Sequence, residues 1–474
     1  MKKISFLICV LLFVSISNAQ RPLVIEGATL IDGNIKPPVK NSVIVIQGTK
    51  ISVVGKKGKV KIPTDAVKID ARGKYIIPGL IDAHIHYDSP RDLIQLLAWG
   101  VTSANCMFES TDDALNMQNQ TSGDSVHAPQ IYATAPIFST EHGWWWGEGF
   151  PNDSSVNRFP STPAEAKEQI RKVKAKGIQR IKLMYDNMDW CRDPLPPFSQ
   201  MQQNVMNALI REARAQGMFT EVHAPKLRDA VQAIDAGVSA FAHGILDHEL
   251  DEFFMQAIEG KKVFYVPTMC LYEFLADVSG FMQHALADER FRSALPDEQR
   301  IRYSSPEYYN RYRERYPNIT FVKEHLEILR QNMTKIMEGE VEQEYFEQNI
   351  TPEQIKKTEK EREKEEREHP REQTNVALGT DMWAFPGIGA HLELEYMSGT
   401  GIQPLEVLSA ATRVGAKFLG RESVIGTVEA GKQADLLILD SNPLKDIRNT
   451  RSIRTIIKHG VVFDHQKLIE ESKR

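Results

Sequence analysis

The middle of the chain alternates short apolar strands with helical segments, and this alternation restricts the fold more than any other feature. Helical patterns such as TPAEAKEQIRKVKAKG and KLRDAVQAIDAG separate most of the strands. The candidate strands are, in chain order, GLIDAHIH, GVTSANCM, QIYATAPI, IQRIKLMY, FTEVHA, SAFAHG, VFYVPTM and NVALGTD. Such a series predicts an α/β fold, a parallel (β/α)8 TIM-like barrel over residues 79–414. An open doubly wound sheet is the alternative, but no Gly-rich phosphate-binding turn follows an early strand.

Both ends of the chain predict β-structure of another kind. Residues 20–78 contain LVIEGATLIDG, SVIVIQGTKISVVG and AVKIDARGKYIIPG, and residues 415–474 contain GTVEAGKQADLLILD and RTIIKHGVVFDHQ. These are runs rich in Val and Ile that are separated by Gly-containing turns. We expect the two ends to form one small β-sandwich domain beside the barrel.

A long insertion separates the seventh strand from the eighth, at about residues 272–372. It includes the dense mixed-charge run TEKEREKEEREHPRE, in which Glu363 and Arg367 have i,i+4 spacing, and this spacing predicts a solvated helix. The insertion leaves the barrel at the end where an active site is expected, so a lid or a partner surface is the alternative role.

The N-terminus has the pattern of a secretory signal peptide. Lys2 and Lys3 precede an apolar segment at 4–16, which is too short to span a bilayer comfortably, and Ala19 is a suitable cleavage position. We expect residues 1–19 to be removed and the protein to be exported to the periplasm or the extracellular space. An uncleaved N-terminal anchor is the alternative. No later stretch of the sequence predicts a membrane-spanning helix.

Charge and cysteine content exclude other classes of protein. The 474 residues have a formal net charge of −5, which gives no basic surface of the kind that binds nucleic acid. After the signal peptide three distant cysteines remain, Cys106, Cys191 and Cys270. This odd number argues against a disulfide framework, although one pair could bridge.

Residues able to bind metal lie at the ends of separate predicted strands. In a (β/α)8 barrel these ends meet at one mouth, where catalysis takes place. The residues at the predicted mouth are His84, His86, Lys182, His223, His243 and Asp381. Each has an ordinary alternative: core histidines, a salt-bridging lysine, or a helix N-cap for Asp381. Because six such residues lie at the ends of five strands, we predict a site for two divalent metal ions, with zinc as the expected metal.

The residues divide into two ligand groups. His84, His86 and Asp381 can hold one metal, and His223 and His243 the other. Two neighbouring cations need a bridging anion. Lys182 as an ammonium ion cannot bind a metal, so it fits this mouth only if it is neutral or chemically modified.

The ordered set of motifs IIPGLIDAHIH, GVTS, IKLM, EVHA, AHG, ALGTD, PLEVLSAATRVGAKFLG and GTVEAGKQADLLIL resembles the amidohydrolase superfamily. It is most similar to the imidazolonepropionase-like branch, which includes Xaa-Pro dipeptidases. The resemblance covers about residues 22–465, and it implies a distorted barrel with a β-sandwich. It also implies that Lys182 is N-carboxylated and that its carbamate bridges the two metals.

Hydrolysis is the chemistry that such a site predicts. Two cations lower the pKa of a shared water, one polarises the substrate carbonyl, and both stabilise the oxyanion that develops. Asp381 would act as the catalytic residue that accepts the proton of the water and passes it to the leaving amine. We therefore expect a metal-dependent amidohydrolase that cleaves a C–N bond in a small amide or dipeptide-like substrate.

Substrate contacts are predicted from two places. The loop FSTEHGWWWGEGF carries His142, which matches a His-Gly of the resembling branch, although Ser139, Thr140 and Glu141 differ from the residues usual before it. Tyr185 follows Lys182 by three residues and is a candidate for holding a substrate carboxylate. The three tryptophans at 144–146 could line an apolar pocket or only pack the loop.

Other functions remain open at this point. A lactonase, esterase or phosphotriesterase could use the same metals, and a non-catalytic ligand-binding barrel is the alternative of a different class. The complete set of ligands favours an enzyme. The sequence leaves the substrate, the native metal and the oligomeric state undecided, and a homo-oligomer is one of the open arrangements.

Overall fold

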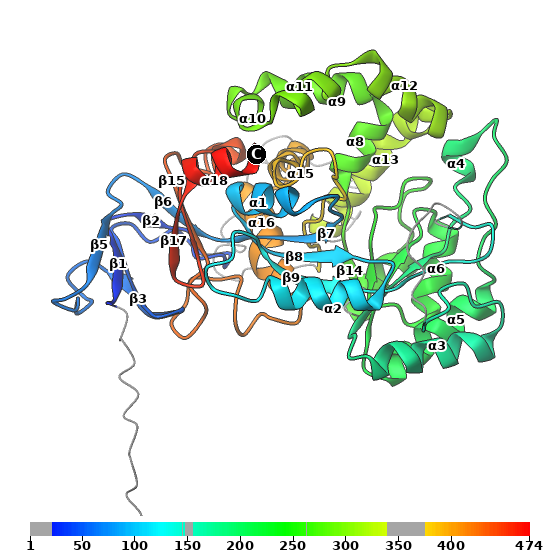
Figure 1. Cartoon of the computed structure of the whole chain (residues 1–474), viewed down its shortest axis with the longest axis horizontal. Helices are drawn as coiled ribbons and strands as arrows, with labels where there is room; N and C mark the ends of the chain where they lie inside the picture. The colour runs from blue at the N-terminus through cyan, green and yellow to red at the C-terminus, as the bar shows by residue number, and fades with distance from the viewer. Residues whose placement is uncertain (1–20, 145, 147–154, 262, 339–374) are drawn as a thin grey trace, which may run out of the picture.

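The computed structural model describes residues 21–144, 146, 155–261, 263–338 and 375–474 (Figure 1). The predicted signal peptide, the charged run with Glu363 and Arg367, and Trp145 lie outside these residues.

Two parallel sheets form the middle of the chain. The first has the order β7-β8-β9, and the second has the order β10-β11-β12-β13-β14. The strands are β7 Leu80–Ile85, β8 Val101–Met107, β9 Gln130–Thr134, β10 Ile137–Phe138, β11 Arg180–Met184, β12 Phe219–His223, β13 Ala240–Phe241 and β14 Phe264–Tyr265. Their order along each sheet follows the order in the chain, as predicted for consecutive β/α units.

Hydrogen bonds continue the pairing beyond these sheets. The amide of Ala135, just after β9, donates to the carbonyl of Arg180 at 3.0 Å. At the other edge Val376 forms a parallel bridge with Tyr265, and the amide of Ala83 in β7 donates to the carbonyl of Leu378 at 2.8 Å. The predicted eighth strand, NVALGTD, therefore lies between β14 and β7 without forming a regular strand of its own.

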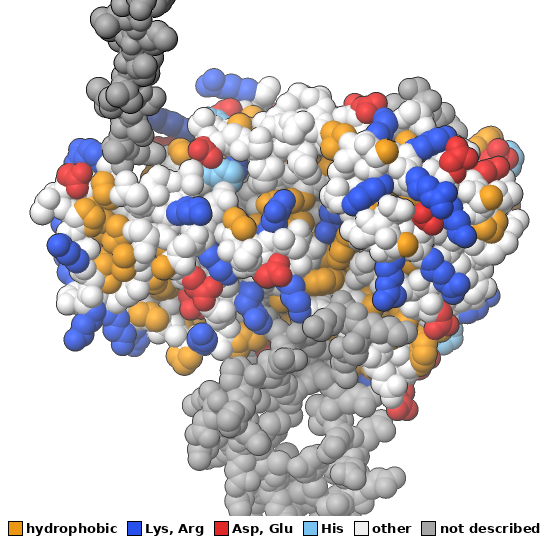
Figure 2. Space-filling model, turned by 90° about the horizontal axis from the view of Figure 1, so that it is seen from below, with side chains coloured by type: hydrophobic (Ala, Val, Ile, Leu, Met, Phe, Trp, Pro, Cys, Tyr) orange, Lys and Arg blue, Asp and Glu red, His pale blue; other side chains and the backbone are white. Residues whose placement is uncertain are grey.

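Helices follow most of the strands and cover the sheets from outside. Helix α3, Pro163–Ala175, shows how the sequence encodes them: the hydroxyl of Thr162 accepts a hydrogen bond from the amide of Glu165, and Pro163 occupies the first turn. The other helices of this layer are α1 Pro90–Ala98, α2 Thr111–Gln120, α5 Gln203–Ala215, α6 Leu227–Ala236, α7 Glu252–Lys261, α15 Ile388–Gly399 and α16 Pro404–Ser409. From the side of α3 and α5, Figure 2 shows charged side chains of both signs between small groups of hydrophobic ones.

The chain ends form two further sheets. One has the order β4-β3-β1-β5, and the other has the order β17-β16-β15-β6-β2, which joins both ends of the chain. Their strands are β1 Leu23–Glu26, β2 Thr29–Leu30, β3 Ser42–Gln47, β4 Lys50–Lys56, β5 Val67–Asp70, β6 Tyr75–Pro78, β15 Leu436–Leu439, β16 Ile453–Lys458 and β17 Val461–Asp464. Residues of both sheets, among them Ile25, Ile44 and Ile438, share one buried apolar cluster. Strands from both chain ends therefore share one sheet, and the β-sandwich domain itself stays a prediction.

The insertion is helical where it is described. Its helices are α8 Met269–Ala276, α9 Val278–Ala287, α10 Glu289–Ala294, α11 Asp297–Tyr303, α12 Pro306–Arg315 and α13 Ile319–Glu338. Figure 1 shows α9–α12 along the top of the molecule, above α15, while α8 and α13 lie beside each other. Across the described ranges, no helix has the length and apolar character needed to cross a membrane.

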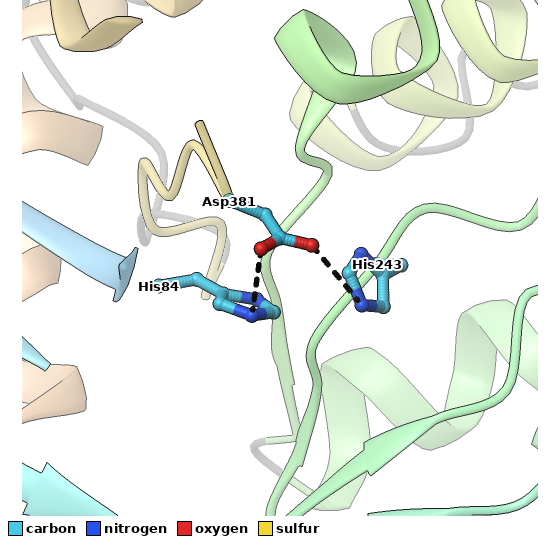
Figure 3. Close-up of side chains that lie close together, drawn as sticks. All are labelled: His84, His243 and Asp381. Carbon is cyan, nitrogen blue, oxygen red and sulfur yellow. Dashed lines mark ion pairs between the residues drawn. The ribbon is translucent and has the colours of Figure 1, made fainter. Parts of the chain in front are cut away.

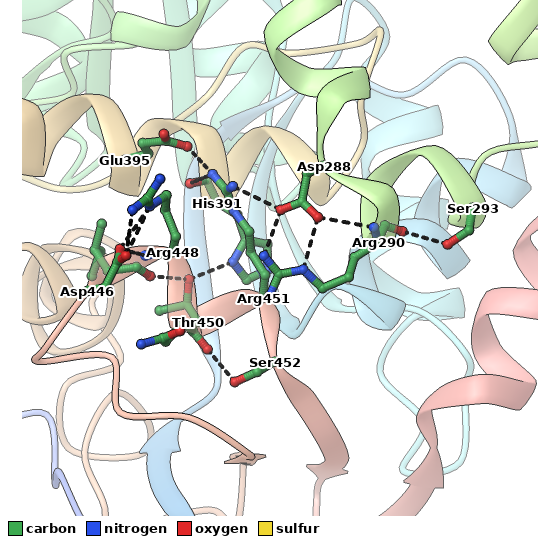
Figure 4. Close-up of polar contacts among 12 residues, drawn as sticks. Asp288, Arg290, Ser293, His391, Glu395, Asp446, Arg448, Thr450, Arg451 and Ser452 are labelled. Atoms are coloured by element: carbon green, nitrogen blue, oxygen red, sulfur yellow. Dashed lines mark hydrogen bonds and ion pairs between the residues drawn. The ribbon is translucent and has the colours of Figure 1, made fainter.

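A polar network fastens this helical layer to the rest of the chain (Figure 4). The buried guanidinium of Arg451, in the short helix η3 (Ile447–Arg451), contacts Asp288 at 3.1 Å and also pairs with Glu395 of α15. Asp288 precedes α10 and pairs with Arg290 at 2.7 Å. One arginine near the C-terminus thus ties α10 of the insertion to α15.

Candidate active site

One cavity of about 600 Å³ collects the side chains predicted at the strand ends. Its lining includes all six predicted metal-site residues: His84, His86, Lys182, His223, His243 and Asp381. They come from β7, β11 and β12 or from the residues that follow β7, β13 and the bridge at Val376. The predicted convergence on one mouth is therefore present in the structure.

The carboxylate of Asp381 occupies the centre of the cluster, between His84 and His243 (Figure 3). Its oxygens lie 3.7 Å from Nε2 of His84, 3.5 Å from Nε2 of His86 and 3.9 Å from Nε2 of His243. Possible ligand atoms of His84, His243 and Asp381 all lie within 4.8 Å of one another. The His223 ring is 4.5 Å from that of His243 between centroids, so the second predicted ligand pair is also close together.

Backbone contacts hold Asp381 in an unusual conformation. Its φ is +48°, which costs a non-glycine residue on the order of 1 kcal/mol or more. The amide of Asp381 donates to the carbonyl of His84 at 2.8 Å. A Cβ added at Gly379 would lie 2.3 Å from Val266 and 3.0 Å from His84, so the segment before Asp381 can approach β7 only with glycine there.

The buried carboxylate of Asp82, which was not predicted from the sequence, also holds the segment before Asp381 against β7. Asp82 accepts hydrogen bonds from the amide of His84 at 3.1 Å and from the amide and hydroxyl of Thr380 at 3.1 and 2.8 Å. Burial raises the pKa of Asp82 to about 7. Its position two residues before His84, on the same face of the strand, was the available signal.

The rings of His84 and His243 are each oriented by a contact of Nδ1, the nitrogen that points away from the cluster. Nδ1 of His84 lies 2.9 Å from the carbonyl oxygen of Ala242, which can only accept, so Nδ1 carries the proton. Nε2 then presents its lone pair to the cluster, and it is buried without a hydrogen-bond partner. Nδ1 of His243 lies 3.0 Å from the hydroxyl of Thr268, a residue of the predicted strand VFYVPTM that was also missed. A buried imidazole nitrogen with no hydrogen bond fits a bound metal ion better than a packed core.

His223 has a different partner. Its Nε2 lies 3.3 Å from Asp186, which also accepts from the indole of Trp190 at 2.8 Å and pairs with Lys226 at 3.3 Å. Burial alone would raise the pKa of Asp186, but the contacts with His223, Lys226 and Trp190 lower it. This anchored carboxylate fixes the ring and leaves Nδ1 of His223 as the remaining nitrogen for coordination.

The electrostatics keep the ligand groups in suitable forms. Burial lowers the pKa of all four histidines, for His86 to about 3, and Lys182 acts in the same direction. They are therefore neutral at pH 7, which is the form that binds metal. Burial also lowers the pKa of Lys182 to about 8, although Asp381 and Glu221 act against it. Four neutral imidazoles and a carboxylate are a donor set that fits divalent metal.

The predicted substrate contacts lie elsewhere. His142 is exposed, with a φ of +58°, and its ring is 4.2 Å from that of Trp146. The phenol of Tyr185 donates to Gln232 at 2.5 Å. Among the described residues, neither His142 nor Tyr185 belongs to the cavity lining, whereas Trp144 does. The substrate-binding roles of His142 and Tyr185 stay predictions without support from this geometry.

The inserted helices supply the other wall of the cavity. No motif in the sequence predicted which of their residues would line it. The residues from α8, α11 and α12 and their ends are Leu271, Tyr272, Leu275, Arg302, Arg311, Tyr312, Arg315 and Tyr316. Asp88, Glu109 and Asp113 line it from the segments that follow β7 and β8. The cavity therefore joins a polar cluster of metal-binding type to an aromatic and arginine-bearing wall.

Imidazole and carboxylate groups gathered at the carboxyl ends of parallel strands define the class of protein: a hydrolase-type α/β fold whose mouth collects possible metal ligands. The chain belongs to the amidohydrolase family, whose family model matches residues 75–463. The predicted resemblance is thereby confirmed, and so is the prediction of a hydrolase acting on C–N bonds.

Individual relatives are distant. Ochratoxinase from Aspergillus niger is 21% identical over 504 residues, covering 95% of this chain and 90% of its own. A Xaa-Pro dipeptidase structure with bound methionine has a TM-score of 0.67 at 21% identity and covers 94% of this chain and 100% of its own. A putative prolidase from Bifidobacterium longum has a TM-score of 0.68 at 21% identity, with 96% and 100% covered. At this identity the solved structures establish the fold, and the substrate is a separate question.

Proposed function

We propose that this chain is an exported, binuclear metal-dependent amidohydrolase that hydrolyses an amide or dipeptide-like C–N bond in a small substrate. The observation that carries the proposal is the buried, unpartnered Nε2 of His84, which faces the carboxylate of Asp381 beside His243. The names of the relatives, ochratoxinase and Xaa-Pro dipeptidase, agree with hydrolysis of amide-type bonds.

The proposed ligands are those predicted from the sequence. His84, His86 and Asp381 would hold one metal, zinc being the expected ion, and His223 and His243 the other. When bound, the metals would supply a water of lowered pKa and polarise the scissile carbonyl. The amine of Lys182 would add to carbon dioxide with loss of a proton. The lowered pKa of Lys182 favours this reaction because only the neutral amine is nucleophilic.

The chain's own residues would move the proton. Asp381 would accept the proton of the water and pass it to the leaving amine. In the metal-free protein, burial raises the pKa of its carboxyl group to about 7, against the effect of Lys182. Its 13% exposed side chain faces the cavity, within reach of a substrate leaving group there. The aromatic side chains of the opposite wall would exclude bulk water from this exchange.

The proposed site would lie in a larger two-part architecture. Residues 79–414 would form a closed distorted barrel, with a β-sandwich built from 20–78 and 415–474. Support comes from the hydrogen bond between Ala83 and Leu378 and from the apolar cluster shared by the terminal sheets. Export rests on the pattern of residues 1–19 alone, and a homo-oligomer is one of the assemblies that purification would reveal.

The test combines metal content with a substrate panel. Metal per chain is measured first, and then hydrolysis of Xaa-Pro dipeptides and N-acyl amino acids with zinc and bicarbonate supplied. Asp381→Asn should keep most of its metal and lose about 1,000-fold or more in kcat. Asp113→Asn, which changes a carboxylate on the same cavity, is the matched control and should stay within a few-fold. Metal-loaded protein that cleaves lactones or esters but no amide would contradict the proposal.

A further inference from the structure

The inserted helices add positive charge to the lining of the cavity that holds the metal-type cluster. Arg302 of α11 and Arg311 and Arg315 of α12 line the same cavity as His84 and Asp381. Arg311 and Arg315 are four residues apart and so share one face of their helix. Arginine stays charged at any physiological pH, so the wall is cationic in the free protein.

Helix α12 is docked firmly enough to define a binding wall. The indole of Trp383, two residues after Asp381, donates to the phenol of Tyr312 at 2.8 Å, and the two rings stack at 6.1 Å. The Tyr312 ring also meets Phe274 edge-on at 4.9 Å. The helix that carries Arg311 is therefore tied directly to the segment that carries the central carboxylate.

The three arginines differ in how their charge is balanced. Arg302 acts electrostatically on Asp88 and lies 5.5 Å from the Tyr308 ring. Arg315 lies 5.2 Å from the ring of Trp144, which fixes its plane against an aromatic face. Among the described residues, the exposed side chains of Arg302 and Arg311 have no hydrogen bond or ion pair, and Arg311 also lies over no aromatic ring. Arg311 is thus the member of the group with its fork of donors available to a ligand.

The acidic residues of the cavity have to be weighed against this wall. Asp88, Glu109 and Asp113 line the cavity from the segments after β7 and β8, and Arg158 acts electrostatically on Glu109. They come from other elements than α12, although Asp88 interacts electrostatically with Arg302. A substrate with an anionic end would be attracted to Arg311 and repelled by these carboxylates. A substrate recognised through a cationic amine would instead place that amine beside the carboxylates.

We propose that Arg311 recognises a free carboxylate of the substrate, so that this enzyme prefers substrates such as N-acyl aromatic amino acids over their amides. The inference rests on the proposed function for the identity of the reacting bond. A guanidinium binds a carboxylate through two parallel hydrogen bonds, and Trp144, Tyr312 and Trp383 line the cavity beside it for an aromatic side chain. Tyr185, the candidate from the sequence, is engaged with Gln232 instead.

The test compares two probes that differ only in charge, N-acetyl-L-phenylalanine and N-acetyl-L-phenylalaninamide. Binding to the zinc-loaded protein is followed by tryptophan fluorescence, because Trp144 and Trp383 lie on the cavity. Wild type should bind the acid at least 10-fold more tightly than the amide. Arg311→Met should weaken binding of the acid by about 10-fold and leave the amide almost unchanged, because the carboxylate of the acid loses a charge-assisted bidentate contact.

Two further variants make the result specific to this side chain. Arg313→Met removes an exposed arginine of the same helix that is not part of the cavity lining, and it should behave as wild type. Arg311→Lys keeps the charge without the planar fork and should fall between wild type and Arg311→Met. Equal weakening of acid and amide, or no preference for the acid in wild type, would overturn the inference, as would tighter binding of an amine-bearing probe.

Failure of this inference can be told apart from failure of the proposed function. Binding of the acid through Arg311 in a protein that hydrolyses no amide would leave the inference standing and reject the function. Hydrolysis of amides with an unchanged KM in Arg311→Met would reject the inference and leave the function standing. A role of Arg311 in folding alone would lower the thermal midpoint and weaken both probes together.

Discussion

The two walls of the cavity differ in how their side chains are held. The strand-end wall, with His84, His243 and Asp381, is fixed by backbone hydrogen bonds between β7 and its neighbours and by buried partners such as Asp82 and Thr268. The helix wall, with Arg311 and Tyr312, is fixed by aromatic packing and by the polar network around Arg451. The first arrangement suits chemistry that needs fixed positions, and the second suits a surface that selects the substrate. Variants of the two walls should therefore fail in different ways.

The largest effect should come from Lys182 on the strand-end wall. In Lys182→Ala the proposed bridging carbamate is lost, so metal content should drop and kcat should fall by about 1,000-fold or more. A short carboxylic acid such as acetate can enter the space that the lysine leaves, and it should restore part of both. Metal per chain and kcat, with and without acetate, are the measurements.

Lys172→Ala, which removes an exposed lysine of α3, is the control and should retain full activity. A Lys182→Ala protein with normal metal content and normal turnover would show that the strand-end wall works without this side chain. The catalytic role given to the strand-end wall would then be wrong.

A smaller effect should follow when an orienting partner is removed. Thr268→Val keeps the shape of the side chain but takes away the hydroxyl next to Nδ1 of His243, so zinc affinity should fall by about 10- to 100-fold. Thr268→Ser retains the hydroxyl and should bind zinc as wild type does. Competition with a fluorescent zinc chelator measures both. Equal affinities for the Val and Ser variants would contradict an orienting role for Thr268.

The same difference between the walls explains how far the sequence could be used for prediction. His84, His86 and Lys182 were found because the parallel strands have a fixed direction, and direction alone brings strand ends together. The two-residue period of a strand also indicates that Asp82 lies on the same face as His84. Its partner Thr380 could not be found in this way, because it lies 298 residues away in the sequence. The terminal sheets were predictable for a related reason, since runs rich in Val and Ile at both ends had no other core to join.

Residues of the helix wall have no such rule. Arg311 belongs to a charged amphipathic helix, and nothing in its local pattern tells which face turns toward the cavity. That face is decided by packing of Tyr312 against Trp383, a contact between residues 71 positions apart. For His142, the motif gives its place in the loop but not the direction of its ring, which lies against Trp146.

A third prediction concerns the junction of the two walls. Glu393 of α15 accepts hydrogen bonds from the amides of Met269 and Cys270 at 2.9 and 2.6 Å, at the start of α8 and directly after Thr268. Burial raises its pKa from 4.5 to about 8. Between these two values the folded protein keeps a proton that the unfolded chain has released, so the free energy of unfolding falls as the pH rises through this window.

Glu393→Gln removes this titration and should flatten the pH dependence of stability between about pH 5 and pH 8, by about 3–4 kcal/mol across the window. Urea unfolding at a series of pH values measures the slope. The NH2 group of the substituted glutamine cannot accept a hydrogen bond, so one of the two backbone amides of Met269 and Cys270 loses its partner. The variant should therefore also be less stable at pH 5. Parallel curves for wild type and variant would mean that Glu393 does not hold the proton.

The smallest effect should be seen where the helix wall is anchored. Asp288 caps α10, and although its partial burial would raise its pKa, hydrogen bonds from Arg290 and Arg451 lower the pKa to about 2. Asp288→Asn keeps a good capping residue and removes only the charge, so the loss should stay below about 1 kcal/mol at pH 7. Because the native pKa is depressed, the charge stabilises the fold above about pH 4, and this contribution disappears as the pH falls toward 2. Wild type and variant should therefore converge in acid, as followed by urea unfolding at pH 7 and pH 3.

Activity separates this anchor from the strand-end wall. The kcat of Asp288→Asn should remain within about twofold of wild type. A loss on the scale expected for Lys182→Ala would mean that the two walls act as one unit.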